Sequence, residues 1–344
     1  MGVAIKDLIE KKDINLNFLK DKTLVVDGYN NLYQYISSIR QRDGSLLTDS
    51  NGKVTSHLVG LFSRTTKLMI KGIKFIFVFD GEAPEMKKLE RKRRSNIKKE
   101  AQKKYDQAKK EENIDEMRKY ASRTTRLTPE MVIEAKKLLN ALGVPVVQAP
   151  SEGEAQASYM VKKGDAFAVV SQDYDSFIYG ATKVIQDLNI SAKRKKINKF
   201  AYQKINPKLI ILGDVINQLG IDQEQLIVLS ILVGTDYNIG GIKGIGPKTA
   251  LKLVKQYGKD FEDLFLENKW ADNFAFKWTD VFYTIKNMKV TDDYKLEWKG
   301  VNEKDLIKLL VEEHEFSEER VMKTIKELSK NQEKVQQKGL GDFF

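Results

Sequence analysis

The chain has 344 residues, long enough for one large domain or two smaller ones, and no cysteine, which excludes disulfides, zinc–thiolate sites, iron–sulfur clusters and cysteine nucleophiles. Lys and Arg number 59 against 48 Asp and Glu, and the net charge of +11 favours a polyanionic partner, nucleic acid before an anionic membrane, with solubility alone as the alternative. No apolar run reaches the roughly 20 residues of a membrane-spanning helix, and with only two histidines the chemistry falls to carboxylates.

Three apolar runs in the first half of the chain each lead to an acidic residue. The runs and their acids are 23–26 with Asp27, 75–79 with Asp80, and 167–170 with Asp173. Their β-branched and aromatic residues are typical of buried parallel strands. Helical patterns alternate with them at 56–71, 129–142 and 151–163. The sequence therefore predicts an α/β fold in which the three acids meet at the carboxyl edge of a sheet, although a turn-capping role could explain any one of them alone.

A highly charged helical segment interrupts this alternation between Glu82 and about Thr128. Residues 87–110 carry 12 Lys or Arg and three Asp or Glu, a net charge of +9. A solvated helix normally mixes charges of both signs, so this imbalance favours phosphate binding over simple solvation. We expect the segment to project from the core. A second basic run at 193–196 is explained equally well by an exposed turn.

The segment 149–155 should begin a helix, with Ser151 as N-cap and Glu154 at the capping-box position. Capping would explain Glu154, and the helix dipole would explain Glu152, without any catalytic role. Further acids nevertheless follow later apolar runs, and together they make seven candidates: Asp27, Asp80, Glu152, Glu154, Asp173, Asp175 and Asp236. Converging acids raise each other's pKa unless divalent ions neutralise them. Two Mg²⁺ or Mn²⁺ ions at such a site would hydrolyse a phosphodiester.

The last third of the chain, from about Pro207, is mostly helical and contains a glycine-rich segment at 241–250. Two tight turns there precede Pro247 at a first helical position, so exposed backbone amides, with Lys243 and Lys248 nearby, can hold a DNA phosphate without reading sequence. An ordinary helix hairpin is the alternative. After about Leu328 the composition turns polar, and we expect a flexible tail.

Seven motifs together resemble the flap endonucleases of the XPG-type structure-specific nuclease family, archaeal type, along nearly the whole chain. They lie at 25–29, 55–58, 78–81, 149–155, 171–175, 234–237 and 241–250, the last as a helix-two-turn-helix. The resemblance implies a mixed, mainly parallel sheet flanked by helices, with a helical arch and a helix-two-turn-helix. It also implies a 5′-flap endonuclease with 5′–3′ exonuclease activity, which serves replication (Okazaki fragment maturation) and repair by two-metal-ion hydrolysis.

The same resemblance implies roles for single residues. The seven acids would be the metal ligands, and Lys87 with an arch arginine would steer the scissile phosphate. Arg94 is the ungapped match, while Arg91 and Arg93 stay possible because the arch departs from the usual pattern and Ala83 replaces a common proline. Tyr33 would stack on a base and Arg40 would lie near the DNA junction, with core packing and surface charge as alternatives. The remaining DNA contacts, around a bound K⁺, would be Gly234, Asp236, Gly241, Lys243, Gly244, Gly246 and Lys248.

The implied organisation is a single nuclease domain, 1–328, followed by a tail, 329–344. The domain would comprise an N-terminal region 1–105, an arch at about 82–130, an internal region at about 140–236 and the helix-two-turn-helix at about 225–260. The tail matches a sliding-clamp (PCNA) binding box through Gln337, Leu340, Phe343 and Phe344. These features suggest a monomer that binds branched DNA with a 5′ flap in an archaeal cytoplasm, or in a nucleus if the source is eukaryotic.

Two other functions compete with this one. A sister enzyme of the family would act mainly as a junction resolvase or 5′ exonuclease, which the clamp box and compact length disfavour. A catalytically silent, clamp-recruited DNA-junction binder would not need seven intact acids.

Overall fold

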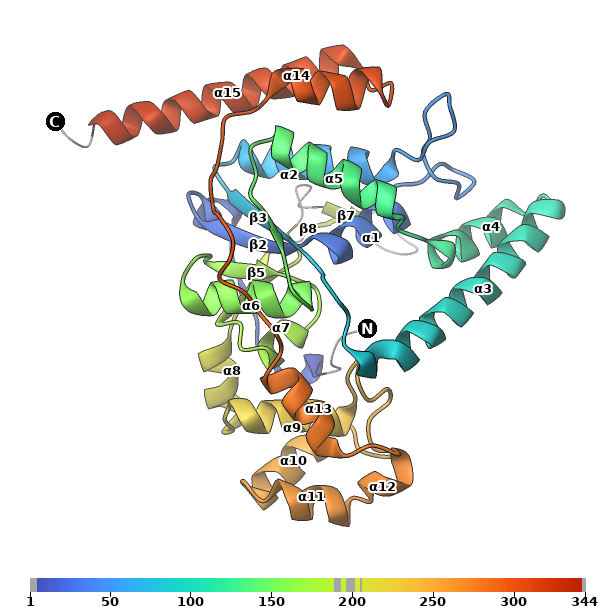
Figure 1. Cartoon of the computed structure of the whole chain (residues 1–344), viewed down its shortest axis with the longest axis vertical. Coiled ribbons are helices and arrows are strands. Elements are labelled where there is room, and N and C mark those ends of the chain that lie inside the picture. Colours follow the sequence, from blue (N-terminus) through green and yellow to red (C-terminus); the bar gives the residue numbers. More distant parts are fainter. Residues whose placement is uncertain (1–4, 189–192, 196–201, 205, 342–344) are drawn as a thin grey trace.

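A central sheet covered by helices on both faces forms the body of the molecule in the computed structural model, which describes residues 5–188, 193–195, 202–204 and 206–341 (Figure 1). The seven strands have the order β1-β9-β6-β5-β2-β3-β4. Their bounds are β1 Lys12–Asp13, β2 Thr23–Asp27, β3 Lys74–Phe79, β4 Val146–Gln148, β5 Ala168–Val170, β6 Lys183–Gln186 and β9 Lys208–Ile211. Strands β6, β5, β2, β3 and β4 are parallel, whereas β9 and β1 form an antiparallel edge. The predicted mixed, mainly parallel sheet is confirmed.

The two central strands are buried on both faces, which explains why they read as continuous apolar runs. Leu24 and Val25 of β2 have no exposed surface, and Phe75 to Phe79 of β3 are at most 3% exposed. One core lies between the sheet and the helices α1 Gly28–Ser38, α2 Ser56–Met69 and α5 Pro129–Ala141. The other lies on the side of α6 Gly153–Lys163, α7 Asp175–Ile178, α8 Leu212–Leu219 and α9 Gln223–Val233.

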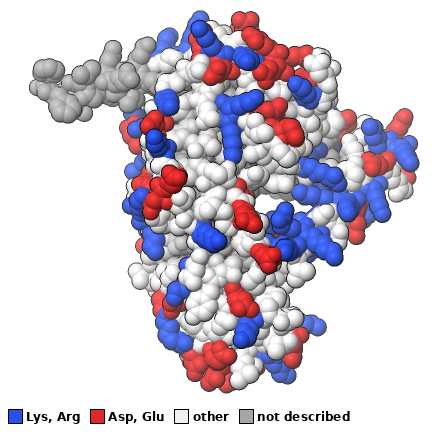
Figure 2. All heavy atoms as spheres, in the orientation of Figure 1, with Lys and Arg blue, Asp and Glu red and all other residues white. Residues whose placement is uncertain are grey.

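The charged segment forms an arm that stands away from this body (Figure 1). It starts at a short turn, η3 Glu85–Lys87, and consists of α3 Lys88–Lys110 and α4 Ile114–Ala121, followed by η4 Ser122–Thr124. Only small or slender side chains, Ala101 and Ala108 on α3 and Met117 and Ala121 on α4, are buried between the two helices. Figure 2 shows blue basic side chains gathered on the arm and beside it. The prediction that this segment projects from the core is confirmed.

The helix-two-turn-helix is built from α9 and α10 Pro247–Tyr257, with Pro247 in the first turn as predicted. Between them, Gly241 has φ +62°, and a Cβ there would lie 2.3 Å from the Leu232 carbonyl oxygen, so only glycine fits. Three further helices, α11 Phe261–Glu267, α12 Trp270–Asn273 and α13 Trp278–Lys286, surround an aromatic core next to this motif. A two-stranded ribbon pairs β7 Lys193–Lys195, the second basic run, with β8 Tyr202–Lys204.

The C-terminal segment returns across the sheet to pack beside α2 (Figure 1). It begins with α14 Glu303–Leu306 and a π-helical stretch, Ile307–Glu312, and ends in α15 Glu318–Gly341. We expected the chain to leave the fold after about Leu328, but α15 continues without interruption to Gly341. Leu328 is buried and the Asn331 amide donates a hydrogen bond to the Ile70 carbonyl, so α15 is held to the body as far as Asn331.

The predicted clamp-binding box falls largely outside the described part of the chain. The backbone at Gln337 and Leu340 belongs to α15, but the side chains from 332 onward and the whole of Phe343 and Phe344 lie outside the described residues. Within the described residues, no helix is long and apolar enough to cross a membrane.

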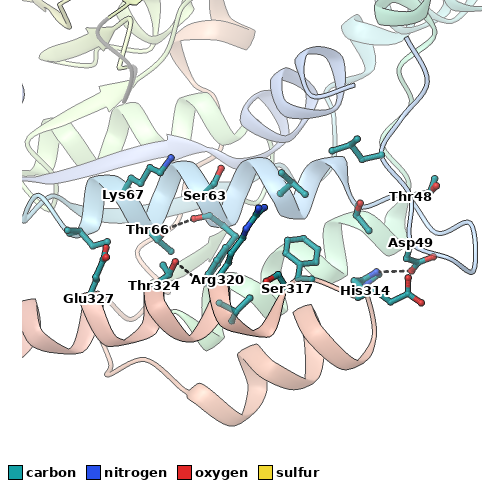
Figure 3. A pocket seen from close by; sticks show the side chains of 18 residues that line it. Thr48, Asp49, Ser63, Thr66, Lys67, His314, Ser317, Arg320, Thr324 and Glu327 are labelled. Carbon is teal, nitrogen blue, oxygen red and sulfur yellow. Dashed lines mark hydrogen bonds and ion pairs between the residues drawn. The ribbon is translucent and has the colours of Figure 1, made fainter. Parts of the chain in front are cut away.

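A pocket of about 540 Å³ lies between α2 and α15, as Figure 3 shows. The two histidines of the chain meet at Glu134 of α5, close to one end of this pocket: His57 Nε2 is 3.0 Å from Glu134 Oε2, and His314 Nε2 is 3.3 Å from Glu134 Oε1. On its other side, His314 Nδ1 lies 3.4 Å from Asp49 Oδ2. Both histidines are at most 2% exposed. This histidine cluster therefore joins α2, α5, the loop before α2 and the C-terminal segment.

Candidate active site

The first two acids are fixed by the backbone at the carboxyl ends of β2 and β3. Asp27 ends β2 and caps α1, where its Oδ1 accepts the N–H of Asn30 at 3.0 Å. Asp80 follows β3 and accepts the N–H of Gly153 at 2.6 Å. A Cβ at Gly153 would lie 2.7 Å from Asp80 Oδ1, so glycine is what allows this approach. Because β2 and β3 are parallel neighbours, the two acids lie at one edge of the sheet.

The structure corrects the predicted start of the helix at 151–163. Helix α6 begins at Gly153 with Glu152 in the N-cap position, and the Ser151 hydroxyl donates instead to the Glu82 carbonyl at 2.9 Å. The predicted capping box is therefore wrong. The carboxylate of Glu154 accepts hydrogen bonds from the hydroxyls of Ser176 (2.6 Å) and Ser171 (3.2 Å). The segments that follow β3 and β4 are joined by backbone hydrogen bonds, among them one from Gly81 N–H to the Ser151 carbonyl at 2.7 Å.

All seven predicted acids line one cleft of about 430 Å³. Asp173 lies in the loop after β5, and Asp175 begins the short helix α7. Asp236 comes from the loop that follows α9, so the helix-two-turn-helix contributes directly to the cleft. Acids that are scattered along 27–236 are thus brought together, as the sequence predicted.

Negative charge is poorly compensated in the part of the cleft next to the sheet. Burial raises the pKa of Asp27 to about 7, and the charge of Asp80 adds to the rise. Burial also raises the pKa of Asp80, with Glu152 reinforcing it, and the pKa of Glu154, with Asp175 reinforcing it. A divalent cation would relieve this repulsion.

Two cations from the foot of the arm hold the acids on the opposite side of the cleft. Lys87 Nζ donates to Glu152 Oε2 at 2.6 Å and lies 3.5 Å from Asp236 Oδ2. Arg94 Nη2 lies 2.9 Å from both carboxylate oxygens of Asp236. Burial by itself would lower the pKa of Lys87, but the charges of Glu152 and Asp236 outweigh burial and the pKa is raised. Both side chains therefore stand charged beside the acids.

The structure separates Arg94 from the two other candidate arginines. Arg94 lines the cleft, whereas Arg91 and Arg93 do not. Arg93 binds Glu90 through Nε (2.7 Å) and Nη2 (2.8 Å). The hydrogen bond from Arg93 lowers the pKa of Glu90 to about 2 despite burial, with Arg94 adding to the effect. Sequence reasoning missed Glu90, because nothing local distinguishes a buried carboxylate from a surface partner in an i,i+4 pair.

Other cleft residues were also missed. Tyr29, Tyr179, Tyr237 and Lys98 all line it. The hydroxyls of Tyr179 and Tyr237 are 2.7 Å apart, and Lys87 lies over the Tyr237 ring at 5.4 Å from its centroid. Tyr29 and Tyr237 stand in the motifs at 25–29 and 234–237 and could have been found from them. Tyr179 and Lys98 had no such signal, because only the tertiary fold brings them to the cleft.

The predicted DNA-contact residues fall at three places. Tyr33 of α1 lines the cleft, with Lys98 Nζ 4.7 Å from its ring centroid. Arg40 does not line the cleft, and it holds the base of the arm to the body by donating to the Gly44 carbonyl and to Thr125 Oγ1, each at 2.8 Å. The remaining residues belong to the loop from α9 to the start of α10: Gly234, Asp236, Gly241, Lys243, Gly244, Gly246 and Lys248. Lys243 and Lys248 are exposed there.

The donor set fits divalent cations. It consists of carboxylate oxygens alone, which suits Mg²⁺ or Mn²⁺ better than softer metals. As the side chains lie, no three acidic groups of the described residues are gathered closely enough to hold one ion, and Lys87 and Arg94 supply counter-charge to two of them. The raised pKa values of Asp27, Asp80 and Glu154 mark the acids whose charge is still uncompensated.

Comparison with known proteins agrees with this geometry. Residues 1–101 match the XPG N-terminal domain, and residues 143–236 match the XPG I-region. A flap endonuclease 1 of Pyrococcus horikoshii is 47% identical over 344 residues, which cover 100% of this chain and 98% of the relative. A flap endonuclease 1 of Hyperthermus butylicus is 48% identical over 333 residues, which cover 96% and 95% of the two chains.

Solved structures show the same relationship. The flap endonuclease-1 of Methanococcus jannaschii superimposes with a TM-score of 0.75 at 42% identity, covering 96% of this chain and 98% of that one. The catalytic core of Rad2 in complex with DNA substrate has the same fold, with a TM-score of 0.69 at 21% identity over 94% and 97% of the two chains. Nucleases of this kind depend on a metal ion. The chain therefore belongs to the flap endonuclease 1 family of XPG-type nucleases.

Proposed function

We propose that the chain is a Mg²⁺-dependent, structure-specific nuclease that cuts 5′ flaps from branched DNA, with 5′–3′ exonuclease activity at the same site, in DNA replication and repair. The observation that carries this proposal is the cleft itself. Seven carboxylates line it together with Lys87 and Arg94 from the foot of the basic arm. Family membership supports the same activity.

In the proposed reaction Lys87 and Arg94 hold the scissile phosphate. Both already have a side-chain nitrogen within 3.5 Å of Asp236, so a phosphate bound there would be placed beside the acids. The seven carboxylates would hold two Mg²⁺, with Mn²⁺ as a substitute. When bound, these ions supply a water nucleophile and stabilise the leaving oxygen. The fixed charges of Lys87 and Arg94 stabilise charge that develops on the phosphate in the transition state.

The rest of the DNA would lie along the two surfaces that meet at the cleft. The arm with its net charge of +9 over 87–110 would hold the 5′ single strand. The loop between α9 and α10 would hold duplex phosphates and K⁺ through backbone groups. A Cβ at Gly244 or Gly246 would have no atom within 4 Å, so the backbone there is open to a ligand. Tyr33, beside the acids, would stack on a base near the scissile bond.

A panel of labelled DNAs tests the proposed activity. A 5′ flap, a nick, a gap, an overhang and a four-way junction are incubated with the chain in Mg²⁺, in Mn²⁺ and with the metal chelated. We expect the flap to be cut fastest, and chelation to stop all cleavage. Preference for the four-way junction or the overhang would favour the sister enzyme. Binding without cleavage in either metal would favour the silent junction binder.

The pKa of Asp27 predicts how metal binding should depend on pH. In the folded chain this pKa is about 7, above the ordinary 3.8, so the contribution of Asp27 to stability is complete below 3.8 and is lost as the pH rises through 7. The pKa values of Asp80 and Glu154 are raised as well. Mg²⁺ binds the ionised groups and removes the free-energy cost of ionising them in the folded chain. The rise in melting temperature on adding Mg²⁺ should therefore be several degrees larger at about pH 8 than at about pH 5.

Differential scanning fluorimetry with and without chelator measures the difference. Asp27→Asn is the internal control, because it should stabilise the metal-free chain at the higher pH and reduce the effect of Mg²⁺. An equal shift at both pH values would contradict the prediction.

We further propose that the end of the chain binds a sliding clamp, PCNA, through Gln337, Leu340, Phe343 and Phe344. The proposal rests on the box in the sequence, since aromatic and aliphatic anchors commonly supply most of the energy of a small interface. Because the relatives are archaeal, we propose an archaeal clamp as the partner and the cytoplasm as the place where they meet. On this proposal the chain is a monomer until it meets the clamp.

Replacing Phe343 and Phe344 with alanine tests the clamp proposal. The double variant should lose stimulation by an archaeal clamp, while its cleavage of a flap without clamp stays at the wild-type rate. Lys338→Ala is the matched control, because it changes a spacer position of the same box. If the double variant keeps its clamp affinity in a calorimetric titration, the anchor lies elsewhere.

A further inference from the structure

We infer that Glu90 is a positioning residue that selects Arg94, and not its neighbour Arg93, for the scissile phosphate. This inference rests on the proposed function of Arg94. Glu90 is the third residue of α3 and is only 3% exposed, on a helix whose other charged side chains are mostly exposed. A carboxylate buried at this level is destabilising unless cations hold it. Arg93 and Arg94 both hold it, and they contact the carboxylate through different sets of nitrogens.

The two arginines use different edges of their guanidinium groups. Arg93 donates to Glu90 through both Nε (2.7 Å) and Nη2 (2.8 Å), a two-point contact that turns this edge toward Glu90. Arg94 donates to the same carboxylate through Nε alone, at 2.6 Å. Its Nη2 is left for the cleft, where it lies 2.9 Å from both oxygens of Asp236. Among the described residues, Arg93 makes no hydrogen bond or ion pair with any residue that lines the cleft.

This division gives each arginine a separate task. The Nε contact fixes the guanidinium plane of Arg94 while its terminal nitrogens face the acids, so a phosphate meets a group that is already oriented. The two-point contact keeps Arg93 away from the same phosphate. The helix makes both contacts possible, because residues three and four positions after Glu90 lie on its side of α3. Glu90 therefore decides which of two adjacent and chemically identical side chains reaches the reaction.

A positioning role and a purely structural role predict different kinetics. Replacing Glu90 with glutamine removes the charge that orders both arginines and leaves the arm more positive. DNA affinity should then be unchanged or tighter, with a steeper salt dependence, while the chemical step becomes slower. If Glu90 only held the arm together, its loss would lower the melting temperature and weaken DNA binding.

The experiment compares single-turnover cleavage of a 5′ flap at saturating protein with the Kd for the same DNA under chelation. We expect Glu90→Gln to slow cleavage by roughly 10- to 100-fold, the scale of loss for a small misplacement of a reacting group, without a weaker Kd. Glu90→Asp keeps the charge but shortens the reach, so it should resemble Glu90→Gln. Glu100→Gln removes the same charge from an exposed position of α3 and should leave the rate close to wild type.

Three further variants distinguish the possible failures. Arg93→Ala leaves the contact between Glu90 and Arg94 intact and should cleave at close to the wild-type rate. Adding Glu90→Gln to Arg94→Ala should cause no further loss, because Glu90 acts through Arg94. A wild-type rate for Glu90→Gln alongside a slow Arg94→Ala would overturn the inference and leave the proposed function standing. A wild-type rate for Arg94→Ala would overturn the proposed role of Arg94 itself. A Glu90→Gln chain with a lower melting temperature and weaker Kd would assign Glu90 to arm stability instead.

Discussion

Asp175→Asn should leave DNA binding nearly intact and reduce single-turnover cleavage by roughly a thousandfold, the order of loss found when one strong electrostatic stabiliser of a transition state is removed. The substitution keeps the shape of the side chain but deletes a charge at the cleft. Its carboxylate lies near Glu154, whose pKa it helps to raise, so the two acids stand where a divalent ion would relieve their repulsion. The rate is measured at saturating protein and the Kd under chelation.

Asp214→Asn provides the control for this variant. Asp214 of α8 forms an exposed ion pair with Lys12 of β1 and does not line the cleft, so its loss should change neither rate nor affinity. If Asp175→Asn cleaved within a few-fold of the wild-type rate, Asp175 would not be a metal ligand. A weaker Kd with an unchanged rate would place it in DNA binding instead.

Lys87→Ala should slow the chemical step by roughly 100- to 1,000-fold and weaken DNA binding far less. Lys87 is largely buried between Glu152 and Asp236, and its raised pKa keeps it charged at every pH used in an assay. Removing it takes away a fixed positive charge at the point where negative charge develops on the phosphate. It also leaves Glu152 without its 2.6 Å partner and makes the cleft more negative, so half-saturation should need a lower Mg²⁺ concentration.

The neighbouring residue supplies a matched comparison. Lys88 is exposed and pairs only with Glu85 in the described residues, so Lys88→Ala removes the same charge without touching the cleft. This variant should bind DNA slightly more weakly, and the slope of the logarithm of its DNA-binding constant against the logarithm of salt concentration should fall by about one. Its single-turnover rate should be unchanged. Equal rate losses for the two variants would mean that the charge of the arm, and not the position of Lys87, determines the chemistry.

The sequence predicted the sheet and its acids because both depend on local patterns. Short runs of β-branched and aromatic residues between helical patterns are typical of central strands, and in parallel strands the residue after the run lies at the carboxyl edge. Asp27, Asp80 and Asp173 follow this rule. The other four acids line the same cleft, but for Glu152 and Glu154 the sequence left the helix dipole and helix capping open as explanations.

The errors arose where tertiary contacts override a local pattern. The segment 151–154 has the residues of a capping box, but the bond from Gly153 N–H to Asp80 sets the start of α6 and leaves Glu154 facing Ser176. The polar composition after about Leu328 predicted a tail, and the contact of α15 with the body at Asn331 shows that the attached part extends slightly beyond that position. Glu90 and Tyr179 escaped notice for the same reason, because their importance lies in what the fold packs against them.

The histidine cluster gives the molecule a natural spectroscopic reporter. The chain has only two histidines, and both lie buried against Glu134, outside the acid cleft. One is on α2 and the other precedes α15, so selective isotope labelling of histidine would give two imidazole signals that respond to the attachment of the C-terminal segment. Neither ring takes part in the proposed reaction. The attachment of this segment can therefore be followed during a reaction without an engineered label.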